Sequence, residues 1–353
     1  MGLFPCHDDL TAAAVAVAED RTGPVRGFFV KLLIGIAGLA LLVKFGSIDF
    51  TVLGAAVDKP LMLGAAFLCL LATIPISAMR WLLLLRALQF RFSGLWTLNT
   101  TFISMFFNTF LPGAYGGDLV RLAIAYRGAG GHLNHLTFSV IVDRLTGLLS
   151  LLLLGIAMVP ALPPVYADRL EWLAGLALLG LVVGLVIAVR FGALFIGLAL
   201  RIPAPVGPKV AHILTEILGA LGAYLSQPLI LIAAVAISIV QFALVLAALI
   251  IVGHAMGFVQ LSWSGYVVAG VWSIIANALP ITPGGIGVGE AAFAQAAFAL
   301  SSPSTQNSGF GTVFLATRIL TLLVSLIGLL PWLFYRTDLQ SGLVAIKKSE
   351  STG

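Results

Sequence analysis

The sequence predicts an all-α polytopic membrane protein, and three observations lead to that prediction. Of its 353 residues, 60% are hydrophobic and only 9% are charged, whereas an ordinary soluble domain carries about 25% charged residues. Several apolar runs approach or exceed the roughly 20 residues that a helix needs to cross a bilayer. Two further apolar stretches contain polar residues and end in turns rich in glycine and proline. So few charges could not cover the surface of a water-soluble fold.

Six full spans are expected from the apolar runs. They fall at about 28–43, 61–79, 136–160, 171–189, 228–252 and 312–334. A surface-lying amphipathic helix is expected over 205–225, where polar residues recur on one side at helical spacing. These elements define a cytoplasmic N-terminal segment (1–27), a transmembrane domain (28–335) and a cytoplasmic tail (336–353).

The placement of basic residues predicts the orientation. Arg80, Arg86 and Arg91 follow the second span as the densest basic cluster of the chain. Because basic residues favour the cytoplasmic side, we expect this cluster and both termini in the cytoplasm, with the chain in the cell (cytoplasmic or inner) membrane. The formal net charge of +5 does not indicate nucleic acid, since there is no basic stripe with interleaved aromatic residues.

Two interrupted stretches, 95–111 and 266–282, read as re-entrant half-helices instead of plain spans. The first leads into LPGAYGG and the second into PITPGGIGVGE. An unsatisfied backbone group costs several kcal/mol in hydrocarbon, so such turns can lie at membrane depth only where protein or a water-filled cavity covers them. The sequence therefore predicts two broken-helix segments inside the membrane domain.

The two segments also share an order of features, in blocks at about 95–160 and 266–334. Each has an asparagine, a Leu-Pro pair, paired glycines, an acid, and an arginine that opens a leucine-rich span. The matching pairs are Asn108 with Asn277, Pro112 with Pro280, Asp118 with Glu290, and Arg144 with Arg318. With the expected topology, the first hairpin enters from the cytoplasm and the second from outside, which is the inverted repeat of many transporters. The alternative is that glycine–proline breaks simply recur in helical membrane proteins.

The breaks supply the candidate substrate-binding residues. Helices beginning near Gly117 and Gly289 would point positive dipole ends at a cavity, which suits an anionic head group. Ionisable residues at membrane depth are functional candidates by default, and the planar fork of arginine suits phosphate. The candidates are Asn108, Pro112, Gly116, Gly117, Asp118, Arg121, Arg144, Asn277, Pro283, Gly284, Gly285, Gly287, Glu290 and Arg318.

Structural roles remain open for several of these residues. Asp118 with Arg121, or Asp143 with Arg144, could form ion pairs that only stabilise the fold. The asparagines could satisfy exposed backbone in the breaks. Asp118 and Glu290 could equally meet a cationic head group or exchange protons.

No catalytic constellation is found in the sequence. His132 and His135 have a spacing compatible with metal binding, but no third ligand lies near them, so a solvated loop is expected. No nucleophile elbow, nucleotide-binding loop, CxxC pair or HExxH motif is present. We therefore expect no metal, no cofactor and no enzymatic activity.

At the two breaks the chain resembles the transmembrane region of lysylphosphatidylglycerol synthases, a flippase-like family that also occurs as stand-alone membrane proteins. The resemblance rests on NTFLPGAYGGDLVRL with VDRLTGLL, and on LPITPGGIGVGEAAF with TRILTLL, and it covers about 28–335. It implies a helical domain that carries an aminoacylated or otherwise modified phospholipid between leaflets. The soluble aminoacyl-transfer domain of the full-length synthases is not found in this sequence, so aminoacylation by this chain alone is not expected.

The expected function is that of a lipid flippase or lipid-transport protein, whose partners are membrane lipids with anionic or aminoacylated head groups. One alternative is a membrane enzyme acting on a lipid-linked substrate. Another is an accessory subunit of an envelope-assembly complex, and transport of a small solute also stays open. A homo-oligomer or an envelope-protein partner is compatible with the sequence.

Overall fold

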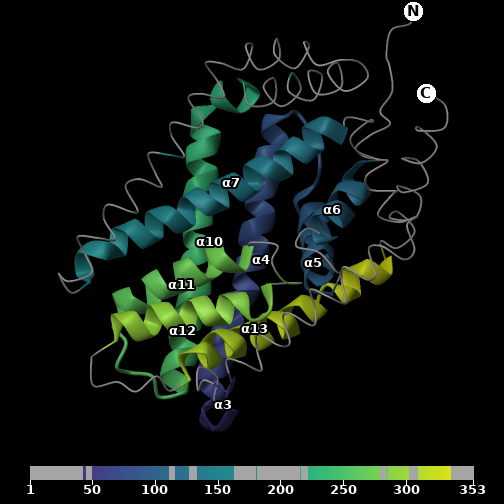
Figure 1. Ribbon diagram of the computed structural model, residues 1–353. Coiled ribbons are helices and arrows are strands. Elements are labelled where there is room, and N and C mark those ends of the chain that lie inside the picture. The colour runs from purple at the N-terminus through teal and green to yellow at the C-terminus, as the bar shows by residue number, and fades with distance from the viewer. Residues whose placement is uncertain are drawn as a thin grey trace, which may run out of the picture.

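The computed structural model describes most of the membrane domain, and every regular element in the described part is a helix (Figure 1). The described residues are 43–44, 50–110, 116–126, 133–162, 180, 215, 222–278, 282, 285–301 and 309–334. The helices are α3 (Phe50–Val57), α4 (Pro60–Ala87), α5 (Gly94–Phe110), α6 (Gly116–Tyr126), α7 (Leu133–Met158), the short 3-10 helix η2 (Val159–Ala161), α10 (Pro228–Ala255), α11 (Trp263–Ala278), α12 (Val288–Leu300) and α13 (Phe310–Leu326).

Four helical segments within the described residues are long and apolar enough to cross a membrane. They are Pro60–Ala87, His135–Ala161, Pro228–Ala255 and Phe310–Phe334, and each matches an expected span. The expected spans at 28–43 and 171–189 lie almost wholly outside the described residues, as do the segments 1–27 and 336–353 and most of the expected amphipathic helix at 205–225. The chain is therefore an all-helical membrane protein.

The centre of the bundle is an antiparallel pair formed by α4 and α10. Both helices begin with a proline, where the missing N–H leaves no helical hydrogen bond unmade. Lys59 Nζ donates to the carbonyl of His254 over 3.5 Å at one end. At the other end, Gln227 Nε2 donates to the carbonyl of Ala87 over 3.1 Å. Each helix therefore starts where the other finishes, and the pair gives the bundle two defined ends.

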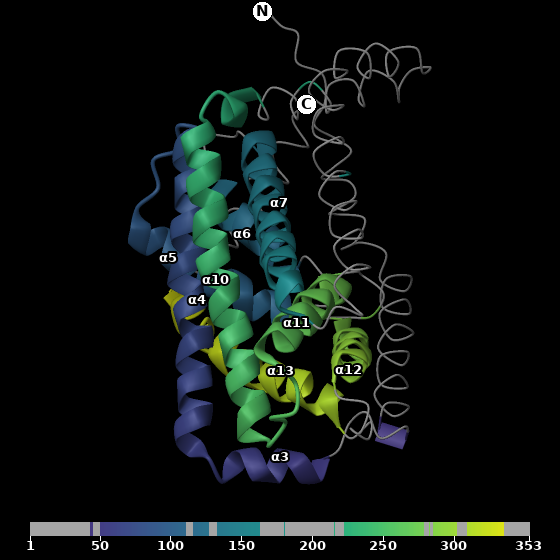
Figure 2. The same cartoon turned by 90° about the vertical axis from the view of Figure 1, so that its left-hand side faces the viewer.

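Two helical hairpins, α5–α6 and α11–α12, pack against this pair and open toward opposite ends. Trp96 of α5 stacks on Trp81 of α4 with ring centroids 6.2 Å apart, so the first hairpin starts beside the last turns of α4. The ring centroid of Trp263 in α11 lies 5.6 Å from that of His254, so the second hairpin starts beside the last turn of α10. Figure 2 shows α5 and α6 beside the upper part of the pair and α11 and α12 beside its lower part.

The second span is longer than the sequence predicted. The apolar run was expected to end at about residue 79, with Arg80 outside the membrane as part of a cytoplasmic cluster. Instead, α4 continues to Ala87, and Arg80 is buried at 5% exposure. The helix continues because other helices supply partners for the Arg80 charge, so a charged residue does not mark the end of the span. The prediction that this span ends before Arg80 was therefore wrong.

Candidate functional site

The first break joins α5 to α6 through the side chain of Asn108. Its Oδ1 accepts a hydrogen bond from the backbone N–H of Gly117 over 2.9 Å. A Cβ atom at Gly117 would stand 2.7 Å from Asn108 Cγ, and it would also collide with the backbone oxygen of Ser104. Only glycine lets the start of α6 approach the end of α5 this closely. The asparagine thus satisfies one of the N–H groups that a helix start leaves unpaired.

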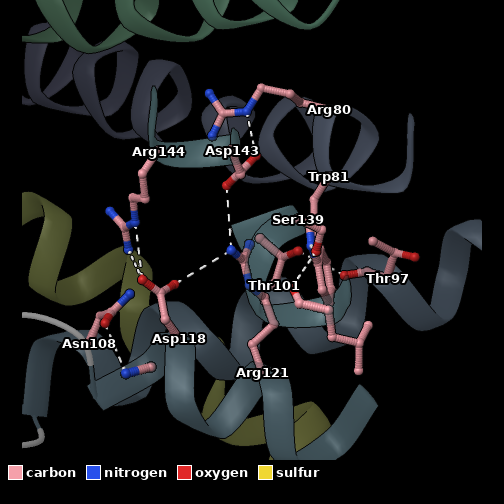
Figure 3. A network of polar contacts seen from close by, with 12 residues as sticks. Arg80, Trp81, Thr97, Thr101, Asn108, Asp118, Arg121, Ser139, Asp143 and Arg144 are labelled. Carbon is pink, nitrogen blue, oxygen red and sulfur yellow. Dashed lines mark hydrogen bonds and ion pairs between the residues drawn. The ribbon is translucent and has the colours of Figure 1, made fainter. Parts of the chain in front are cut away.

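Asp118, in the first turn of α6, lies between two arginines (Figure 3). Its Oδ2 accepts hydrogen bonds from Arg144 of α7, over 3.1 Å from Nε and 2.7 Å from Nη2. Its Oδ1 lies 3.5 Å from Arg121 Nη2, three residues further along α6. The carboxylate therefore bridges two guanidinium groups, one through each oxygen.

The same arginine of α6 reaches a second acid, Asp143 of α7. Arg121 Nη2 lies 3.4 Å from Asp143 Oδ2, and Arg80 Nε of α4 donates to Asp143 Oδ1 over 2.7 Å. Arg80 Nη1 also donates to Ser238 Oγ of α10 over 2.8 Å. We call the five residues Arg80, Asp143, Arg121, Asp118 and Arg144, in this order, the charge ladder. It connects α4, α7 and α6 through alternating charges, and Arg80 extends it to α10.

The charge ladder is buried except at one end, and its charges do not balance. Four of its members are at most 5% exposed, whereas the side chain of Arg144 is 52% exposed. Three guanidinium groups and two carboxylates give these five residues a formal charge of +1. Ionisable residues inside a membrane domain are costly and are therefore candidates for a function.

Arg121 is the least satisfied member of the charge ladder. Its two carboxylate contacts are long, at 3.4 and 3.5 Å, and its buried Nε has no hydrogen-bond partner. Part of its stabilisation comes from Trp81, whose ring centroid lies 4.3 Å from the guanidinium carbon. Trp81 is held in turn by a 3.2 Å hydrogen bond from its Nε1 to Ser139 Oγ. Arg121 is therefore the member of the charge ladder with the weakest contacts to the acids.

The second break is built from the corresponding residues, but they make different contacts. Arg318 of α13 donates from Nη2 to Asn277 Oδ1 of α11, and also to the carbonyl of Gly285 over 3.2 Å. Gly285 has a φ of +69°, in the left-handed region that glycine adopts without strain. Whereas Asn108 binds backbone, Asn277 binds the arginine itself.

Glu290 is the acid of the second break and is fully buried, at 0% exposure. Its Oε2 accepts a hydrogen bond from the backbone N–H of Gly287 over 2.9 Å, which caps the start of α12. Its Oε1 lies 3.3 Å from Arg318 Nε, and the Arg318 side chain is only 18% exposed. One acid faces one arginine here, so the second break is neutral and largely closed to its surroundings.

The structure brings most of the predicted residues together, in two groups. Each acid pairs with the arginine of its own break: Asp118 with Arg144, and Glu290 with Arg318. The Asp118–Arg121 pair also forms, while Asp143 pairs with Arg80 and Arg121. Pro112, Pro283 and Gly284 lie outside the described residues. A cavity shared by the two breaks stays a prediction.

Sequence reasoning did not select four residues that the site uses: Arg80, Trp81, Asp143 and Ser238. Arg80 gave no signal in the sequence, because it directly follows an apolar run that was expected to end at about residue 79. Asp143 was considered only as a partner of its neighbour Arg144. Within the described residues, no group of three metal-ligating side chains occurs.

The fold and the site together define an integral membrane protein in which two broken-helix hairpins pack on a pair of long spans and carry ionised residues within the bundle. The family model described as "Lysylphosphatidylglycerol synthase TM region" matches residues 28–337. The chain belongs to this family, which points to a membrane protein related to lipid handling, as the resemblance of the two breaks implied. Neither a curated protein nor a solved structure matches the chain.

Proposed function

We propose that the chain moves a phospholipid or modified lipid between the two leaflets of the cytoplasmic membrane, with the head group engaging the first break. The observation that supports this most is the charge ladder, which leaves one net positive charge in an apolar bundle and ends in the half-exposed Arg144. A lipid-handling family provides the context in which the anion belongs to a lipid.

Arginine suits the anionic part of a phospholipid head group. A phosphodiester offers two charged oxygens, and a guanidinium group can donate two parallel hydrogen bonds to them. Arg144 already donates two hydrogen bonds, from Nε and Nη2, to the single oxygen Oδ2 of Asp118. An aminoacylated head group adds a cation, for which the acids at the breaks are the complementary groups. We therefore propose anionic and aminoacylated phospholipids as substrates.

The opposed hairpins support a transport mechanism based on an inverted repeat. The first hairpin starts beside the end of α4 and the second beside the end of α10, so each break is reached from a different end of the bundle. In transporters with inverted repeats, two such halves exchange access to the two sides of the membrane. We propose that the end that carries Arg86 and Arg91 faces the cytoplasm, and that both termini lie on the same side.

The proposal includes no enzymatic step. Transport would run down the lipid gradient or be coupled to an ion gradient, because the sequence has no nucleotide-binding motif. Action as an accessory subunit is the main competing proposal, and it differs by requiring a partner protein for any lipid movement.

The test is leaflet exchange in liposomes that contain only the purified full-length chain. Fluorescent phosphatidylglycerol, lysylphosphatidylglycerol and phosphatidylcholine are placed in the inner leaflet, and their arrival in the outer leaflet is followed by chemical quenching. We expect exchange of the first two lipids well above that in protein-free vesicles. Absence of exchange for every lipid, with protein that is folded and inserted in both orientations, would contradict autonomous transport and favour the accessory role.

A further inference from the structure

We propose that Arg121 and Arg144 form an oxyanion site for the substrate's anionic group, and that the Asp118 carboxylate competes with this group for the two arginines. This inference rests on the proposed function, because it assumes that the substrate carries such a group. It goes further by naming the two arginines that bind the anion and the residue that must leave. The ligand class is an oxyanion with two charged oxygens, such as a phosphodiester.

The bridging geometry of Asp118 supports this assignment. One carboxylate oxygen faces Arg144 at 2.7 Å and the other faces Arg121 at 3.5 Å. The two charged oxygens of a phosphodiester can bridge two guanidinium groups in the same manner. Asp118 also stands in the first turn of α6, where the helix dipole favours a negative group. An internal carboxylate therefore fills a position suited to an external anion.

Arg121 remains under-compensated while Asp118 is in place. Arg121 is 4% exposed, its Nε has no hydrogen-bond partner, and both of its carboxylate contacts exceed 3.3 Å. A charged donor left unpaired in a buried setting is costly. A ligand that brings more oxygen atoms than one carboxylate can satisfy this group as well as Arg144. Exchange of Asp118 for such a ligand is then favourable.

The two other buried acids of the described residues, Asp143 and Glu290, do not share this arrangement. Asp143 is bound to Arg80 over 2.7 Å, and Arg80 is also held by Ser238, so this pair joins α7 to α4 and α10. Glu290 is fixed by its own helix, because its Oε2 caps the N–H of Gly287. Asp118 alone among the three combines a bridging position with a half-exposed arginine.

Displacement of Asp118 would reach the break directly. Asp118 follows Gly117, whose N–H is bound to Asn108, and no side chain could replace the hydrogen of Gly117 without a collision. The residue that the ligand would displace is therefore the direct neighbour of the hydrogen bond that joins α5 to α6.

The experiment measures anion affinity in the full-length chain in a neutral detergent, by calorimetric titration with short-chain phosphatidylglycerol. If Asp118 only positions Arg144, its removal weakens binding. If Asp118 competes with the ligand, Asp118→Asn and Asp118→Ala bind about tenfold more tightly than the wild type, because a competing charge is gone. Asp58→Asn makes the same change of charge at an exposed acid near the start of α4 and is expected to bind within about twofold of the wild type. Arg144→Gln is expected to weaken binding.

Equal or weaker binding by both Asp118 variants, with each shown to be monodisperse and helical, would overturn the proposal. Inorganic phosphate is titrated in parallel, and tightening for phosphate but not for the lipid would overturn the assignment to a lipid head group. Leaflet exchange by the wild type is scored separately. Tighter binding by the Asp118 variants without exchange by the wild type supports the site and rejects the transport function. Exchange by the wild type without tighter binding by the variants supports the transport function and rejects the site.

Discussion

The two breaks contain the same residue types in the same order, yet they differ in charge and in exposure. The first break is part of a five-residue ladder with one net positive charge, and its arginine is 52% exposed. The second break pairs one acid with one arginine, and that arginine is 18% exposed. The difference shows that a repeated motif does not fix the local charge: α6 adds Arg121, α7 adds Asp143 and α4 adds Arg80 to the first break.

The asparagines illustrate the same difference at the level of single hydrogen bonds. Asn108 accepts a hydrogen bond from the N–H of Gly117, so it holds the two half-helices together. Arg144, the arginine of this break, pairs with Asp118 instead. Asn277 accepts from Arg318, which also donates to the carbonyl of Gly285. The second arginine is therefore held by three groups, although its buried Nη1 has no hydrogen-bond partner. Under the proposed function, we expect head-group contact at the first break and a structural role for the second.

The largest effect is expected from Asp143→Asn. This change leaves Arg80 and Arg121 buried with no carboxylate between them, and loss of one partner of a buried ion pair costs about 3–5 kcal/mol. SDS titration in mixed micelles, followed by circular dichroism, measures the loss of stability. Asp58→Asn is the control, because it removes an exposed acid near the start of α4. An unchanged unfolding midpoint for Asp143→Asn would show that the charge ladder does not join the helices.

A second expectation contrasts the two arginines in the same assay. Arg318→Gln leaves the fully buried Glu290 without its cation and should destabilise the chain by about 2–3 kcal/mol. Arg144→Gln removes a half-exposed partner and should cost less than about 1 kcal/mol. Equal losses for the two variants would contradict the division into a closed structural break and an open binding break.

A smaller contrast is expected at the two equivalent glycines, each of which precedes the acid of its break. A Cβ at Gly117 would collide with the backbone of Ser104 and with Asn108, so Gly117→Ala should cost about 2–3 kcal/mol. A Cβ at Gly289 would meet mainly the ring of Phe314, which can move, so Gly289→Ala should cost about 1 kcal/mol. The reverse order would mean that the first break is the looser of the two.

Much of the fold follows from the sequence because hydropathy and helix breakers are local signals. Four expected spans match helices of the structure, and the expected helix starts near Gly117 and Gly289 fall within one residue of the starts of α6 and α12. The charge ladder could not be predicted, because it depends on which helices lie side by side. Arg80 and Ser238 are 158 residues apart and yet share a 2.8 Å hydrogen bond.

The misplacement of Arg80 has the same physical origin. In a sequence, an arginine at the end of an apolar run looks like a residue that has left the membrane, since an isolated charge there is costly. Its partner Asp143 lies 63 residues further along the chain, on another helix. Only the packing of α4 against α7 reveals that the charge is compensated inside the bundle.

The central claim is that the half-exposed arginine of the first break handles the lipid head group, and leaflet exchange with Arg144→Gln tests it most directly. The matched control is Arg86→Gln, which removes an exposed arginine of α4 that is not a member of the charge ladder. We expect the exchange rate of phosphatidylglycerol to fall about tenfold or more for Arg144→Gln, the effect of losing a charge-assisted contact, and to stay near the wild-type rate for Arg86→Gln. A rate for folded Arg144→Gln equal to that of the wild type would contradict the claim.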